Sequence, residues 1–245
     1  VLEGVCDAFG VDELTISDYA LREGVLLDAL RRFSGAGLNH LSDLRRASVM
    51  HLLEACDDDP GHAIAVARLA LQLHDLLGDR LDLDPEDREL LEAAALLSNV
   101  GLFISHSAHH KHSYYVIRNS EHLTGFTDNE IEMISQVARY HRKSVPSEDK
   151  HPLFAALRSA DRERVRAMAG LLRVAIALDR NHDGGVDFVT AAADNDGVLL
   201  RLHPVDGRDL DLEVFSANDR KGLLETVLGC EVDVSRAESS EADSS

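Results

Sequence analysis

The sequence is poor in cysteine and has no long apolar run. Its three cysteines, Cys6, Cys56 and Cys230, lie far apart and form no CxxC pair, which argues against a disulfide framework or a metal site of that spacing. Such cysteine usage is typical of a reducing compartment, so we expect a cytoplasmic protein. No apolar run approaches the roughly 20 residues that a membrane helix needs, and no signal peptide is visible. We therefore expect no membrane association.

The sequence also has far fewer basic than acidic residues. Asp and Glu number 44 against 25 Lys and Arg, which gives a net charge of −19 over 245 residues. The overall field of such a chain repels DNA and anionic bilayers, so we expect no DNA partner. Any polyanion must then bind at a local basic patch. The length and the 44% of hydrophobic residues suit one large domain or two small ones, each with its own core.

Apolar residues recur at helical spacing through most of the chain. Helix starts are indicated by Asp59-Pro60, by Asp84-Pro85 and by a capping box from Thr127 to Glu130. A histidine-rich connection is expected from His106 to His112, and a last long helix from about residue 160 to 178. These signals predict a helical domain over residues 38–183.

The pattern changes after Gly184-Gly185. Alternating residues predict strands over 186–192, 198–202, 210–215 and 231–234, with a helix at about 218–228. We expect a small α/β domain over residues 184–234 and a disordered, acidic tail over residues 235–245. The fold class is therefore mainly α, with a small α/β unit at the end. Because the chain opens at Val1, we expect it to be the back part of something longer.

Three polar residues fall on apolar helix faces. Asp179 continues the inward stripe of the last long helix, His62 borders the stripe of its own helix, and His141 follows an inner face. Histidines and a carboxylate that converge from separate helices suit a divalent metal. The alternative is that each is a core or boundary group satisfied by hydrogen bonds.

A second group of candidates is basic. The segment from His106 to His151 holds as many Lys and Arg as Asp and Glu, so it is locally neutral in an acidic chain. Guanidinium, ammonium and imidazole donors bind phosphate. The candidate phosphate-binding residues are His106, His109, Lys111, His112, Arg139, His141, Arg142 and Lys143. The alternative is a solvated helix end, where Arg142 and Lys143 offset the helix dipole. Partial protonation of histidines 106, 109, 110 and 112 predicts tighter polyphosphate binding at pH 6 than at pH 8.

A series of motifs resembles one known family. The motifs are Ile16–Val25 (ISDYALREGV), His106-Ser107, His112-Ser113, Gly125-Phe126, Arg139–Lys143 (RYHRK), Leu172–Ala175 (LRVA) and Leu178–His182 (LDRNH). Their order and spacing, over nearly the whole chain, are similar to those of exopolyphosphatases and guanosine pentaphosphate phosphohydrolases.

The resemblance implies that catalysis and binding of the phosphate chain belong to different parts of the enzyme. Residues 1–37 would be the last strand and helix of an actin-like lobe, and the actin-like lobes that carry the catalysis would precede this chain. The helical domain would be HD-like, would extend the path of a bound phosphate chain and would contribute to a homodimer. The intact enzyme would act on polyphosphate or the pentaphosphate alarmone with Mg²⁺, whereas this chain alone would hold no cofactor.

The resemblance also bears on the metal. HD proteins carry a His-Asp ligand pair where this sequence has Ser98 and Asn99, so only His62 and Asp179 match ligand positions. Active-site metals normally have at least three protein ligands. We therefore expect a degenerate HD site in which His62 and Asp179 bond to each other or to Asn99.

The leading hypothesis is a non-catalytic module that binds polyphosphate and helps the parent enzyme to dimerise. One rival is an independent HD-type metal phosphohydrolase acting on nucleotides through His62, Asp179 and the nearby histidines 106, 112 and 141. Another rival is a pure protein-interaction module.

Overall fold

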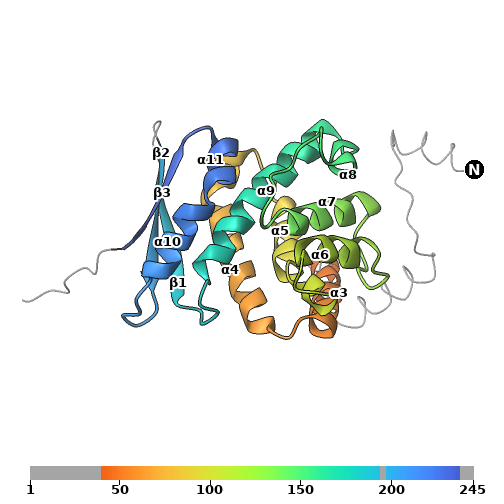
Figure 1. The fold of residues 1–245 in the computed structure, drawn as a ribbon, viewed down its shortest axis with the longest axis horizontal. Helices are drawn as coiled ribbons and strands as arrows, with labels where there is room; N and C mark the ends of the chain where they lie inside the picture. Colours follow the sequence, from red (N-terminus) through yellow and green to blue (C-terminus); the bar gives the residue numbers. More distant parts are fainter. Residues whose placement is uncertain (1–39, 194–196, 238–245) are drawn as a thin grey trace, which may run out of the picture.

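The computed structural model describes residues 40–193 and 197–237 and shows a mainly helical chain with a small sheet at one end (Figure 1). The predicted actin-like remnant, residues 1–37, lies outside the described residues. We call the elements before residue 179 the helical part: α3 His40–Cys56, α4 Pro60–Leu77, η1 Gly78–Leu81, α5 Asp87–Leu96, η2 Val100–Phe103, α6 His109–Arg118, α7 Asp128–Arg139, α8 Pro152–Ala155 and α9 Ser159–Leu178. We call the remaining elements the sheet unit: β1 Val186–Ala193, β2 Gly197–Pro204, α10 Asp211–Arg220, α11 Gly222–Leu228 and β3 Glu231–Arg236.

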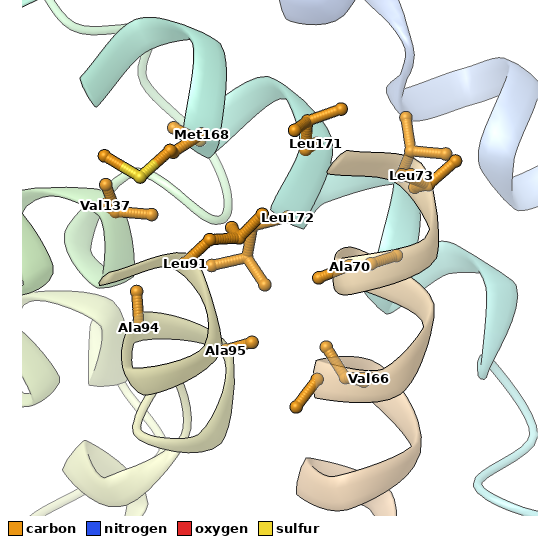
Figure 2. Packing of buried hydrophobic residues seen from close by; sticks show 14 of the residues in the cluster. Val66, Ala70, Leu73, Leu91, Ala94, Ala95, Val137, Met168, Leu171 and Leu172 are labelled. Carbon is orange, nitrogen blue, oxygen red and sulfur yellow. The ribbon is translucent and has the colours of Figure 1, made fainter. Parts of the chain in front are cut away.

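The core lies where α4, α5 and α7 surround α9. Figure 2 shows Leu91 of α5 beside Leu172 of α9, with Ala70 of α4 facing this pair and Leu73 further along α4. All four side chains are fully buried. Alanines allow the helices to approach closely, and each buried leucine contributes roughly 1.5–3 kcal/mol relative to an exposed one. Burial of this stripe is what places α9 at the centre of the molecule.

Two of the predicted helix starts are confirmed. The Asp59 side chain accepts a hydrogen bond from the His62 amide and Pro60 is the first residue of α4. Thr127 and Glu130 form the capping box of α7. The start signal at Asp84 is displaced, because the Asp84 amide donates to the Asp87 carboxylate at 2.9 Å and α5 begins at Asp87.

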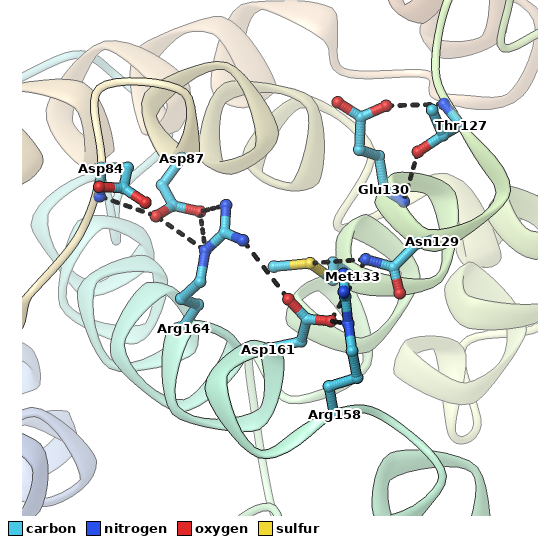
Figure 3. Close-up of polar contacts among 9 residues, drawn as sticks. All are labelled: Asp84, Asp87, Thr127, Asn129, Glu130, Met133, Arg158, Asp161 and Arg164. Atoms are coloured by element: carbon cyan, nitrogen blue, oxygen red, sulfur yellow. Dashed lines mark hydrogen bonds and ion pairs between the residues drawn. The ribbon is translucent and has the colours of Figure 1, made fainter. Parts of the chain in front are cut away.

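A buried ion pair ties α5 to α9 (Figure 3). Asp87 is fully buried and lies 2.6 Å from Nη2 of Arg164, which also contacts Asp161. Arg158 and Asn129 donate to the same Asp161, so α7 joins this network. Removing one partner of a buried pair costs about 3–5 kcal/mol because the other charge is left uncompensated.

The sheet has the order β1-β2-β3, with β1 antiparallel and β3 parallel to β2. α10 and α11 each pack against β3 and against α9. A Cβ on Gly170 of α9 would lie 3.1 Å from the Cα of Leu224, so glycine allows α11 to approach α9 closely. The sheet unit is therefore attached to the helical part through α9. Within the described residues, no helix is both long and apolar enough to cross a membrane.

Two local predictions are wrong. Residues 211–215 form the first half of α10 and not a strand, because Leu210, Glu213 and Ala217 are buried at helical spacing while Leu212 and Phe215 are exposed. Residues 109–112, expected in a connection, form the first turn of α6. That helix starts at Ala108, which has a positive φ of 55° and no side-chain cap, so the sequence carries no start signal there. In addition, β3 continues to Arg236, two residues into the stretch predicted as tail.

Candidate functional site

His62 and Asp179 meet at the base of α4. His62 lies in the first turn of α4 and Asp179 directly follows α9. Nδ1 of His62 lies 2.7 Å from Oδ2 of Asp179, and the two side chains are 4% and 1% exposed. The other carboxylate oxygen of Asp179 accepts the Gly184 amide at 2.9 Å. This direct contact is one of the two arrangements that the sequence predicts for the pair.

A second histidine–aspartate pair covers the first. The ring of His182 stacks on that of His62, with centroids 3.6 Å apart. Nδ1 of His182 lies 2.8 Å from Oδ2 of Asp59, the residue that caps α4. The hydrogen bond from His182 holds the pKa of Asp59 below its ordinary value. We call these four residues, Asp59, His62, Asp179 and His182, the paired network.

The potential metal-ligand atoms of the paired network do not fit a divalent metal. Both carboxylates of the paired network already bind a histidine and a backbone amide. Ser98 is buried and its hydroxyl donates to the Ala95 carbonyl at 3.0 Å, while Asn99 precedes η2. Across the described residues, no three His, Cys, Asp or Glu side chains are grouped so as to hold an ion.

The second group of histidines has no carboxylate partner within residues 40–193 and 197–237. Nε2 of His109 lies 3.2 Å from Nε2 of His141, and Nδ1 of His141 lies 2.6 Å from the Ala138 carbonyl. His141 must therefore donate through Nδ1 to Ala138 and accept through Nε2 from His109. Nδ1 of His109 then accepts from Arg142 at 3.3 Å and does not donate to the His106 carbonyl, which lies 3.4 Å away. We call this the relay: Arg142, His109, His141 and the Ala138 carbonyl.

Burial keeps these histidines neutral. Desolvation, together with the nearby charges of Arg142 and Lys143, lowers the pKa of His110 to about 4. Burial also lowers the pKa of His141 to about 3 and moves that of His109 in the same direction. The prediction of tighter binding at pH 6 therefore depends on histidines other than His110. The exposed side chain of His106 is not part of the relay.

Gly101 sets the position of α6. A Cβ on this residue would lie 2.2 Å from the His109 carbonyl oxygen and 2.3 Å from the Ser113 amide nitrogen, so only glycine fits. The Gly101 amide donates to the Ser113 hydroxyl, which donates in turn to the Ser98 carbonyl at 2.7 Å. These contacts pack the start of α6, with its histidines, against η2.

The remaining predicted phosphate ligands lie at the surface. His106, Lys111, Arg142 and Lys143 are exposed, and His112 and Arg139 are partly exposed. We call these six residues the basic surface. The Arg139 guanidinium lies 5.4 Å from the ring centroid of Tyr114 and borders a pocket of about 110 Å³. None of these six residues forms an ion pair with a carboxylate in the part of the chain that the structure describes.

The sequence did not identify one supporting residue. Nε of Arg173 in α9 donates to the Tyr140 carbonyl at 2.7 Å, and its Nη2 donates to the Ser144 carbonyl at 2.8 Å. These bonds hold the segment after α7 against α9 and thereby place Arg142 and Lys143. The available signal was that Arg173 is the polar residue of the LRVA motif.

Comparisons with known proteins identify the family of this chain. Residues 44–207 match the Ppx/GppA phosphatase, domain III, family. Because this match covers most of the chain, the chain belongs to the Ppx/GppA phosphatase family. The resemblance that the motifs predict is thus confirmed.

Curated relatives extend the match beyond domain III. The chain is 28% identical to a guanosine-5'-triphosphate,3'-diphosphate pyrophosphatase of Pseudoalteromonas translucida, over 87% of this chain and 42% of that protein. It is 26% identical to the protein of the same description from Photobacterium profundum, over 89% of this chain and 43% of the relative. The corresponding protein of Aeromonas hydrophila is 29% identical, over 82% of this chain and 39% of that protein. The chain thus spans less than half the length of these relatives.

Proposed function

We propose that this chain is the C-terminal, non-catalytic part of a Ppx/GppA-type phosphohydrolase and that its basic surface binds phosphate-chain anions. The observation that carries the proposal is that exposed cations of this surface lack carboxylate partners among the described residues. Lys111, Arg142 and Lys143 are exposed in a chain of net charge −19, yet none of them pairs with a described carboxylate. Cations that remain free of carboxylates are available to phosphate oxygens, for which charge-assisted bonds are strong.

We propose supporting roles for His109 and His141. Both are buried, and their ring nitrogens are used within the relay. They therefore orient Arg142 and do not contact the anion themselves. Direct contacts would come from His106, Lys111, His112, Arg139, Arg142 and Lys143.

Catalysis would belong to the part of the relatives that this chain does not cover. The paired network leaves no set of donors for a metal, which supports a role other than metal-dependent hydrolysis for the residues around His62. We infer that Mg²⁺, actin-like catalytic lobes and the choice between polyphosphate and the pentaphosphate alarmone are properties of the whole enzyme. An HD-like origin of the helical part is also a proposal, supported by the positions of His62 and Asp179 at separate helix ends.

We further propose a cytoplasmic homodimer. The free thiols of Cys56 and Cys230 are compatible with a reducing compartment. The side chains of Phe103 and Ile104, 72% and 49% exposed at the end of η2, are apolar groups that a contact between copies would cover. Sedimentation equilibrium tests the dimer: a monomer at micromolar concentrations contradicts it.

Titration with inorganic tripolyphosphate tests the phosphate-binding proposal. A triple variant, Lys111→Gln, Arg139→Gln and Lys143→Gln, removes cations of the basic surface but leaves Arg142 in place. We expect the affinity to fall at least about tenfold, because each lost charge-assisted bond contributes on the order of 1.5–3 kcal/mol.

A matched control removes the same charge elsewhere. Arg46, Arg88 and Arg208 are exposed and paired with Glu92, Asp75 and Asp183. Changing all three to Gln should alter the affinity by less than about twofold. Equal losses in both triple variants would show that only the overall field matters. Unchanged binding in the first variant, together with a stable dimer, would favour a pure protein-interaction module.

A further inference from the structure

The sheet unit has two outer strands whose backbone groups need partners beyond the sheet. The order β1-β2-β3 makes β1 and β3 the outer strands, and both pair with β2. On each of them, one row of amides and carbonyls therefore points away from β2. Such a row is a template for pairing with a strand of another chain. What covers these outward groups decides whether the sheet ends at three strands.

Side chains of the two following helices bond to the outward groups of β3. Asn218 contacts both groups of Val234: its Nδ2 donates to the carbonyl at 2.8 Å, and its Oδ1 accepts from the amide at 3.3 Å. The Val232 amide donates to Oε1 of Glu225 at 3.1 Å, and the Val232 carbonyl accepts from the Lys221 ammonium. Side chains thus satisfy all four outward groups at the middle of β3.

The helices that carry these three side chains are held by more than β3. Asn218 lies in the last turn of α10, Lys221 between the two helices and Glu225 in α11. Both helices pack against α9 as well as β3, and Figure 1 shows them between α9 and the strands. An ion pair of 3.4 Å joins Lys221 to Glu225. We call Asn218, Lys221 and Glu225 the edge cover, because they offer β3 the donors and acceptors that a fourth strand would offer.

The other outer strand is covered in the same manner by α4. Nη2 of Arg68 donates to the Val186 carbonyl at 2.6 Å, and its Nη1 donates to the Asp187 carbonyl. The Val189 amide donates to Oε1 of Gln72 at 3.0 Å. Helical side chains therefore bond to strand backbone at both edges of the sheet, so the arrangement is a general feature of the sheet unit.

We propose that the edge cover prevents β3 from pairing with the same strand of a second copy of this chain. Backbone groups at a strand edge pair with those of another strand with little regard to its side chains, and a second copy always presents the same edge. Lys221 and Glu225 keep 18% and 29% of their side-chain surface exposed, so a strand can approach β3 once they are removed. This inference depends neither on anion binding nor on the proposed dimer.

Removal of the edge cover tests the inference. In the variant Asn218→Ala, Lys221→Ala, Glu225→Ala, sedimentation equilibrium should give about twice the mass of the unaltered chain at the same concentration, and this excess should disappear on dilution. Amide hydrogen exchange locates the contact. In dilute solution Val232 and Val234 should exchange at least roughly tenfold faster than in the unaltered chain. They should slow again as the concentration rises, because a second copy then accepts from their amides.

A matched control removes the same three residue types from the helical part. Asn119, Glu121 and Lys150 are exposed, and Nδ2 of Asn119 also donates to a backbone carbonyl. Their joint replacement by Ala should leave the mass equal to that of the unaltered chain. A milder variant, Asn218→Leu, keeps the side-chain volume and frees only the two groups of Val234. It should raise the mass in the same direction, in a fold that circular dichroism shows to be unaltered.

Two results would overturn the inference. One is an unchanged mass in both edge-cover variants although Val234 exchanges faster. The other is an increased mass with exchange of Val232 and Val234 that does not depend on concentration, since the copies would then associate elsewhere. The proposed function is tested by tripolyphosphate titration and fails separately.

Discussion

His62 and His182 each contact an aspartate, whereas His109 and His141 contact each other and a backbone carbonyl. In the paired network, the carboxylates of Asp179 and Asp59 accept from the imidazoles and also from backbone amides. In the relay, a series of hydrogen bonds begins at the Arg142 guanidinium and ends on the Ala138 carbonyl. Both regions use buried histidines, but only the first brings negative charge to them.

This difference decides what each region offers to a ligand. The paired network satisfies its own donors and acceptors, so it stabilises the junction between α4 and α9. The two histidines of the relay are neutral, because burial lowers the pKa of His109 and His141. Among the described residues, the positive charge of Arg142 has no carboxylate partner. Histidine content alone therefore does not mark a metal site or a cationic site.

The largest expected effect tests the paired network. Asp179→Ala removes the acceptor of both the His62 imidazole and the Gly184 amide. We expect a loss of about 3 kcal/mol in the free energy of unfolding, because buried donors are left unsatisfied. Urea unfolding at pH 7 measures it. Asp75→Ala, at an exposed pair with Arg88, is the control and should cost less than about 1 kcal/mol. Similar losses in both variants would contradict a structural role.

A pH titration of stability tests the neutral relay. The pKa of His141 is about 3 in the folded protein, because burial and the neighbouring His109, His110 and Arg142 disfavour its charged form. In the unfolded chain it is about 6.5. Below about pH 6.5 the unfolded chain therefore binds a proton that the folded protein does not, so stability falls as the pH falls. From His141 alone we expect roughly 2 kcal/mol less stability at pH 5 than at pH 7.

The same titration has an internal check. His141→Gln should reduce the slope of stability against pH by about one proton in this range. If the slope stays the same, His141 is protonated in the folded protein and donates through Nε2 to His109 instead of accepting from it.

The smallest effect concerns Lys143. Its φ of 61° lies in the left-handed region, which costs a non-glycine residue about 1 kcal/mol. Lys143→Gly should therefore stabilise the fold by about 0.5 kcal/mol, while it weakens tripolyphosphate binding. Lys111→Gly, within α6, is the opposite control and should destabilise by about 0.5 kcal/mol. Loss of stability in Lys143→Gly would show that side-chain contacts hold this backbone conformation.

Much of the fold could be predicted from local signals. The cap at Asp59, the capping box at Thr127 and the long helix ending at Leu178 all depend on neighbouring residues, and each is present. The start of α6 could not be predicted, because Ala108 carries no capping side chain and Gly101 sets the helix from eight or more residues away. Likewise, the alternating polar and apolar residues 210–215 predict a strand, but packing of α10 against α9 and β3 favours a helix.

The sequence by itself determined the acidic balance, the family motifs and which residues carry titratable or cationic groups. Only the tertiary structure decided which of these groups keep a free charge. The reason is that carboxylates neutralise arginines across distances of up to 85 residues in the chain, as Glu130 does for Arg45, so pairing depends on which helices meet. Among the described residues, the same packing left the exposed Arg142 beside His109 and without such a partner.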